Sequence, residues 1–332
     1  MAQDRRRQGI AAGLALGAAF LWSTYYFFVL AASPAVAPSA LLCYPLLIGG
    51  ALYALWCSRE GHFRSFLRLW ASGEAWIRAA ILFGLQVSIL AGTYLVGPVD
   101  TALLSLVGDV VLTPLLVMTI LRDSRERARS LPFVGGLALS LVGASMTIIG
   151  GQSVAPIVGW GWLIVIAVPL TAALYLVATA RAMREAPTSA IVAQDTLGSG
   201  LLALLVLPLV PGGFAGLVVH GGFNILLVVS LGVVTFFLAA ELYFVSIERA
   251  GLILTTLLMA FIPVFTLVLS ILLLNLTFPL VAILGIPVAV AGAALALQGQ
   301  HPPWPSPGRG GTPLVPPEGD PQDSRAGLTR IP

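Results

Sequence analysis

Apolar residues along the chain fall into ten runs, each long enough to cross a bilayer, and polar residues gather in the short segments between them. A helix needs roughly 20 apolar residues to span about 30 Å of hydrocarbon. The runs cover about residues 10–31, 37–57, 77–97, 101–121, 132–150, 159–180, 189–210, 223–246, 251–274 and 280–299. This pattern predicts an all-α membrane protein with ten transmembrane helices and no large soluble domain.

The first five runs correspond to the second five at a constant separation. A step of 149 positions links seven pairs of less common residues: Tyr26 with Tyr175, Tyr94 with Tyr243, Pro38 with Pro187, Pro114 with Pro263, Gly49 with Gly198, Gly136 with Gly285, and Gly143 with Gly292. A duplicated unit with an odd number of spans places its second copy upside down in the membrane, as in many secondary transporters. We therefore expect two inverted five-helix repeats, residues 10–150 and 159–300. A cytoplasmic tail, residues 1–9, precedes them, and a disordered cytoplasmic tail rich in Pro and Gly, residues 301–332, follows them.

Composition and charge support a membrane location and give an orientation. The chain is 58% hydrophobic and only 9% charged, whereas a soluble domain carries about 25% charged residues. It contains arginine but no lysine, and with the N-terminus in the cytoplasm every arginine lies in a cytoplasmic segment, Arg78 among those between the second and third runs. We expect a multi-pass protein of the bacterial inner membrane with both termini cytoplasmic. The net charge of +3 then reflects orientation, so no nucleic-acid partner is expected.

Several local sequences resemble a known transporter family. The first run reads Ala-Phe-Leu-Trp-Ser-Thr-Tyr-Tyr over residues 19–26, the fourth and ninth runs hold Pro114 and Pro263, and the fifth and tenth contain spaced glycines. In these features the chain resembles the EamA-like ten-helix members of the drug/metabolite transporter superfamily. The resemblance implies transport, with export favoured over import. The family's glutamate about thirteen residues after the proline is matched by Glu126, but the second half has Asn275 and Leu276 there.

Asp109 is the acid nearest the middle of a predicted span. An ionised acid at the bilayer centre costs about 2.5–3.5 kcal/mol on insertion scales, so it calls for a reason. Thr101, Ser105, Asp109 and Thr113 repeat every four residues and so form one polar stripe. Pro114 follows and is expected to kink the helix and free a backbone carbonyl, as is Pro263 in the ninth run. The stripe predicts a substrate or proton path; helix packing is the alternative.

Two further acids lie inside apolar runs. Glu241, beside Tyr243, is a candidate proton or substrate carboxylate, or alternatively a partner for an arginine such as Arg249. Asp195 lies about two turns into the seventh run, after Gln194, which favours snorkelling or capping. The family resemblance also implies that the seventh helix lies outside a central cavity.

Aromatic and amide side chains are candidates for lining a substrate cavity, because they can stack on or hydrogen-bond to a small organic molecule. These candidates are Trp22, Tyr26, Gln86, Tyr94 and Tyr175. Packing or interface anchoring is the alternative for each. The spaced glycines of the first, fifth and tenth runs predict close helix packing, with a homodimer as the alternative use of the same faces.

The residues together favour a transporter that is not an enzyme. The chain has no lysine and so no phosphate-binding loop, which excludes ATP hydrolysis. We expect a secondary transporter that moves an organic metabolite, amino acid, amine or drug by alternating access, with proton coupling through Asp109 as the hypothesis. No arginine lies deep in a run, which favours a cationic, zwitterionic or neutral substrate. No cofactor or metal is expected, because no Asp or His cluster is present. A channel or scaffold and a lipid-modifying enzyme are the alternatives.

Overall fold

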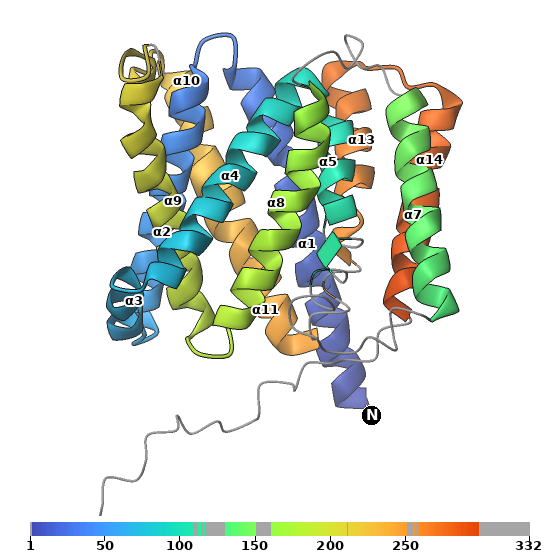
Figure 1. Ribbon diagram of the computed structural model, residues 1–332, viewed down its shortest axis with the longest axis horizontal. Coiled ribbons are helices and arrows are strands. Elements are labelled where there is room, and N and C mark those ends of the chain that lie inside the picture. The colour runs from blue at the N-terminus through green and yellow to red at the C-terminus, as the bar shows by residue number, and fades with distance from the viewer. Residues whose placement is uncertain are drawn as a thin grey trace, which may run out of the picture.

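The protein is a bundle of helices that stand side by side (Figure 1). The computed structural model describes residues 2–108, 112–113, 116, 130–150, 161–210, 212–250, 255 and 258–298. Within these residues no strand is formed. The tail predicted at residues 301–332 lies outside them. Residues 2–9 of the predicted N-terminal tail are helical and continue into the first span.

The first half of the chain contributes α1 (Ala2–Ala32), α2 (Pro38–Arg59), α3 (Phe63–Trp70), α4 (Gly73–Leu95), α5 (Pro98–Val107) and α7 (Leu131–Gly150). The second half contributes α8 (Gly161–Ala182), α9 (Thr188–Val206), α10 (Gly222–Ser230), the π-helical segment η5 (Leu231–Ala239), α11 (Ala240–Ala250), α13 (Ile262–Leu274) and α14 (Leu280–Gln298). Two short 3₁₀ segments, η3 (Leu207–Leu209) and η4 (Ala215–Leu217), follow α9.

Five helical segments are long and apolar enough to cross a membrane: Gly9–Ala32, Pro38–Arg59, Gly73–Leu95, Thr188–Leu209 and Gly222–Ile247. Five shorter apolar helices accompany them: Pro98–Val107, Leu131–Thr147, Ile166–Ala182, Ile262–Leu274 and Leu280–Gly292. Each of these segments overlaps one of the predicted apolar runs. The hydropathy pattern therefore located the helices of a multi-pass membrane protein.

Helix α3 lies where the sequence analysis expected only a connection. Phe66 is buried and packs edge-on against Trp70, with ring centroids 5.8 Å apart, in a cluster that includes Tyr53. Arg64 and Arg68 on the same helix are exposed. At eight residues, α3 is too short to register as a span, and its apolar side covers the end of the bundle near the start of α9.

Prolines mark helix starts in this fold. Pro38 lies in the first turn of α2 and Pro98 in the first turn of α5. Proline suits this position because the first N–H groups of a helix have no partner within it. Pro263, expected to kink a continuous helix, likewise lies in the first turn of α13, just after a turn at residues 260–261. Helical residues 258–259 therefore precede a turn, and α13 begins next to this proline.

Helices α2 and α9 cross closely through small residues. A Cβ added at Gly50 would lie 2.6 Å from the backbone nitrogen of Leu197. A Cβ added at Gly200 would lie 2.8 Å from Cδ2 of Leu47. The glycine of each helix therefore contacts a leucine of the other helix, and in both helices this leucine precedes the glycine by three positions. The two contacts are reciprocal.

Helices α7 and α14 form a second close pair, side by side at one edge of the bundle (Figure 1). A Cβ at Gly285 would lie 2.6 Å from the carbonyl oxygen of Gly143, and one at Gly292 would lie 2.7 Å from that of Gly136. These contacts are again reciprocal. The glycines of the two helices are therefore used within the chain, as expected of small residues at membrane helix interfaces.

The centre of the bundle joins the two halves of the chain. Helix α1 packs against η5 and α11, and α4 packs against α8 and α9. The connection from α1 to α2 lies at the upper end in Figure 1, whereas the connection from α8 to α9 lies at the lower end. Helices α1 and α8 therefore run in opposite directions.

Replacing Gly143 by alanine is expected to destabilise the protein by about 1–3 kcal/mol, the usual effect of overpacking. The added Cβ would overlap the backbone of Ala289 in α14. Thermal unfolding of the purified protein in detergent measures the change. Gly135→Ala on the same helix is the control, because the nearest atom to its Cβ would be 4.0 Å away. Equal stability of the two variants would contradict this packing.

Candidate functional site

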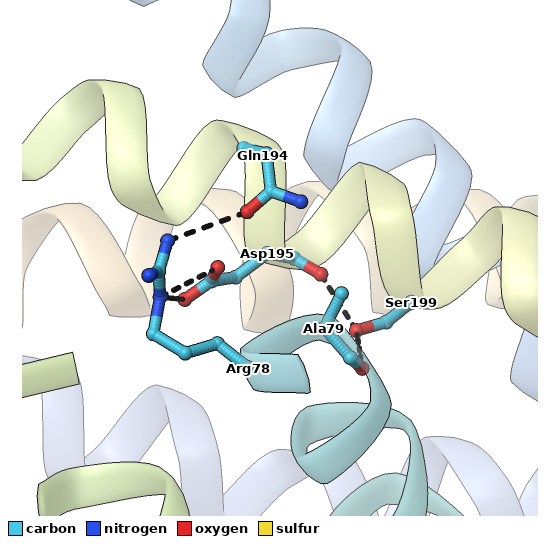
Figure 2. A network of polar contacts seen from close by, with 5 residues as sticks. All are labelled: Arg78, Ala79, Gln194, Asp195 and Ser199. Atoms are coloured by element: carbon cyan, nitrogen blue, oxygen red, sulfur yellow. Dashed lines mark hydrogen bonds and ion pairs between the residues drawn. The ribbon is translucent and has the colours of Figure 1, made fainter. Parts of the chain in front are cut away.

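A buried ion pair connects the two halves of the chain. Arg78 on α4 donates from Nε to both carboxylate oxygens of Asp195 on α9, at 3.1 and 3.2 Å. The side chain of Arg78 is 6% exposed and that of Asp195 is fully buried. Figure 2 shows the guanidinium group pointing directly at the carboxylate.

Polar groups on both sides extend this ion pair into a network (Figure 2). Arg78 also donates from Nη2 to Oε1 of Gln194, at 3.5 Å. The hydroxyl of Ser199 is shared between the carbonyl oxygens of Ala79 and Asp195, at 2.7 and 2.6 Å. The network therefore links α4 and α9 through side chains and through backbone.

This arrangement corrects two expectations. Arg78 was assigned to a cytoplasmic connection and Asp195 to snorkelling or capping, yet both side chains are inside the protein. Removing a charge from water costs several kcal/mol unless an opposite charge and hydrogen bonds compensate, so each residue is buried because the other is. The sequence carried one usable signal: an arginine and an aspartate of opposite sign stand near the same ends of their two apolar runs.

Tyr175, predicted to line a cavity, lies beside this ion pair. Its hydroxyl is close enough to interact with Asp195, and it is also near Arg78. Tyr175 comes from α8, which packs against both α4 and α5. Three helices therefore bring polar side chains to one buried point.

A cavity of about 360 Å³ lies elsewhere between helices of the two halves. It lies between the end of α2, the turn from α8 to α9, and α11. Its polar and aromatic lining comprises Tyr53, Glu60, His62, Ser189, Glu241 and Phe244. Tyr53 lies within electrostatic reach of Glu241 and of Tyr175, whereas neither Arg78 nor Asp195 lines the cavity.

Hydrogen-bonding groups are arranged at two depths in the cavity. His62 Nδ1 lies 3.2 Å from Ser189 Oγ and 3.5 Å from Glu60 Oε2, among partly exposed residues. Tyr53 is fully buried, and its hydroxyl lies close enough to Glu241 to interact with that carboxylate. Glu241 lines the cavity, so it is a predicted carboxylate that lies at this cavity.

Trp22 and Tyr26 pack inside the bundle. Trp22 donates from Nε1 to the carbonyl oxygen of Thr235, at 3.1 Å, and its ring lies 5.1 Å from that of Tyr243. Thr235 is inside the π-helical segment η5, a type of segment that is frequent at functional sites. Tyr26 is buried against Tyr25, with ring centroids 5.6 Å apart.

The other predicted residues are not gathered at the network around Arg78 and Asp195. Gln86 is half-buried and lies about 12 Å along α4 from Arg78, and Tyr94 is 39% exposed about 24 Å along it, at 1.5 Å per residue. The hydroxyls of Ser105 and Thr113 donate to the carbonyl oxygens of Thr101 and Gly108 on their own segment, at 3.2 and 3.1 Å. Asp109 and Pro114 lie outside the described residues.

Comparison with known proteins gives a family match and a fold match. Residues 159–298 match the model described as the EamA-like transporter family. A solved structure, described only as the crystal structure of a protein, aligns over 86% of this chain and 96% of its own, with a TM-score of 0.65 and 23% identity. The likeness shows a shared fold. No curated protein matches the chain.

Replacing Asp195 by asparagine is expected to lower the free energy of unfolding by about 3–5 kcal/mol, because Arg78 would remain buried without a counter-charge. Chemical denaturation of the purified protein measures the loss. Glu74→Gln is the control: Glu74 lies 3.6 Å from Arg181 in an exposed ion pair, which contributes little. An Asp195→Asn protein as stable as the control would contradict the structural role of the pair.

Proposed function

We propose that the protein is a secondary transporter of a small organic molecule, because residues 159–298 match the model of the EamA-like transporter family. The family match is the observation that carries the proposal. Apolar helices long enough to cross a membrane and a cavity between helices of both halves support it. The described residues hold no group of three or more His, Cys, Asp or Glu side chains placed to bind a metal.

Transport would proceed by alternating access between two inverted five-helix repeats with ten spans in total. The opposite directions of α1 and α8 support this arrangement. The reciprocal contacts support it too: those of α7 and α14 relate positions 149 apart, as in the sequence. In α2 and α9 the reciprocal positions, Leu47 with Leu197 and Gly50 with Gly200, are 150 apart. A shift of one residue between the repeats accounts for the difference.

The network around Arg78 and Asp195 suits a hinge or latch between the repeats. It joins α4 of one half to α9 of the other and is asymmetric, because at the 149-residue spacing Leu227 and Leu46 stand in the equivalent positions. A rocking motion of one half against the other would change the surroundings of these charges. We therefore assign the pair a role in setting the relative position of the halves.

Orientation and coupling follow from the charge distribution. Exposed arginines near the lower end, such as Arg64, Arg68 and Arg181, favour that end as the cytoplasmic one in a bacterial inner membrane. Proton coupling through Asp109 stays part of the proposal, as does export.

A homodimer also stays a proposal. The glycines of α7 and α14 are taken up inside the chain, whereas Gly9 and Gly13 on α1 have open space beside them.

A metabolite profile of the medium tests the transporter. Cells that express the wild type are expected to enrich at least one organic compound outside, relative to cells without the protein. Asp109→Asn at matched membrane levels is expected to remove the enrichment, because an asparagine side chain cannot bind and release a proton as a carboxylate does. Equal enrichment by this variant would leave the transporter and exclude Asp109 as the coupling group. No enrichment by the wild type, together with no uptake of any medium component, would contradict transport.

A further inference from the structure

We propose that the outward side of helix α3 (Phe63–Trp70) is a docking surface for anionic phospholipids at the cytoplasmic face of the membrane. The helix lies at the lower left corner of the bundle in Figure 1, against α2, α4 and the start of α9. This role goes beyond transport, and its cytoplasmic placement rests on the proposed orientation.

Helix α3 is held firmly in place by its inward side. At its start, His62 Nδ1 lies 3.2 Å from Ser189 Oγ of α9. At its end, the carbonyl oxygen of Trp70 accepts a hydrogen bond of 3.1 Å from Trp76 Nε1 of α4. Phe66, between these two points, is buried. The outward side is therefore presented in a fixed orientation before any lipid binds.

Two adjacent stripes of side chains form the outward side. Phe63 and Leu67 make up an apolar stripe and are 42% and 53% exposed. Arg64 and Arg68 make up a basic stripe and are also exposed. Residues four positions apart share one side of a helix, and residues next in sequence are rotated by about 100°, so the stripes run side by side. A short helix with this pattern suits the membrane–water interface, where the apolar stripe can enter the lipid.

The surroundings of α3 indicate that it lies at the level of this interface. The half-buried rings of Trp70 and Trp76 are 5.2 Å apart, and tryptophan is enriched where a membrane meets water. On the neighbouring helices, Leu55 and Ile77 are 57% and 61% exposed, each about one turn from the helix end that adjoins α3. Exposed apolar side chains at these positions suit contact with acyl chains. The basic stripe therefore lies where lipid headgroups would lie.

The charges at this corner favour an anionic headgroup. Arg59, at the end of α2, is exposed like Arg64 and Arg68, and no ion pair joins any of the three to an acid of the described residues. Glu60, the acid beside them, lies 3.5 Å from His62. A guanidinium group can donate two parallel hydrogen bonds to a phosphate. A zwitterionic headgroup brings its own positive charge and would be bound less strongly, because the arginines would repel it.

Native mass spectrometry of the full-length protein in detergent tests this docking surface. Phosphatidylglycerol and phosphatidylcholine with identical acyl chains are supplied in equal amounts. We expect the wild type to retain phosphatidylglycerol at least about threefold more than phosphatidylcholine, because basic side chains near a membrane surface attract anionic lipids. Equal retention of the two lipids by the wild type would overturn the proposal.

Variants of the arginines locate the binding. Replacing Arg64 and Arg68 together by glutamine is expected to remove most of the preference and to bring the ratio of the two lipids close to one. Arg181→Gln is the matched control: Arg181 is exposed at the same end but lies 3.6 Å from Glu74 in an ion pair, so its loss should leave the ratio unchanged. A preference that survives in the double variant, or that falls equally in the control, would overturn the proposal.

The depth of the two stripes is a second, independent measurement. Nitroxide labels at Leu67→Cys and at Arg64→Cys are compared in phosphatidylglycerol vesicles, with Cys43 and Cys57 replaced by alanine. The label at position 67 should collide more often with oxygen, which dissolves in lipid, and the label at position 64 with a water-soluble nickel complex. Equal accessibility of both labels to the nickel complex would overturn the interfacial placement of α3.

Lipid binding requires no substrate and no gradient, so its outcome is separable from that of transport. A protein that exports a compound but shows no preference for phosphatidylglycerol would keep the transporter and overturn the docking surface. A protein that binds phosphatidylglycerol through Arg64 and Arg68 but moves no compound would support the docking surface and contradict the transporter.

Discussion

The fold depends on one constraint above the others: a charge inside an apolar bundle must have a counter-charge. Arg78 and Asp195 meet this requirement across the boundary between the halves, at 3.1 Å and almost fully buried. Gln194 and Ser199 add hydrogen bonds on either side, and Tyr175 approaches from a third helix. Because neither charge can remain buried alone, the pair fixes the position of α4 against α9. The cavity beside Tyr53 is likewise lined by residues of both halves.

Close helix packing stabilises the remainder of the bundle. The packing contacts are similar in the two halves, whereas the charged side chains differ. Hydrophobic burial from water does not hold helices together in a lipid, so contact area and backbone approach matter more. Glycine provides that approach where α2 crosses α9 and where α7 crosses α14. The charged side chains are not repeated in this way. The residue of the first half that corresponds to Glu241, 149 positions earlier, is Gly92. The two halves therefore share a scaffold but not their charged side chains.

The sequence predicted the helices well because hydropathy is a property of each run by itself. The resemblance to the transporter family is confirmed over residues 159–298. The hydropathy pattern did not predict α3, because its eight residues are too few for a span. It also did not predict that α13 begins next to Pro263. The partnership of Arg78 with Asp195 was also missed, because 117 residues separate them and only the tertiary fold brings them together. Glu241 and Tyr175 were identified because rare polar groups in apolar runs stand out, whereas Tyr53, in another run, did not.

We propose that the two halves move against each other, and a distance measurement tests this motion most directly. Spin labels at Ser58→Cys and Glu185→Cys would report from exposed positions on the two sides of the cavity. The buried cysteines, Cys43 and Cys57, would be replaced by alanine. Pulsed electron–electron double resonance in nanodiscs should then give two distance populations, one for each arrangement of the halves. A single distance population would contradict alternating access.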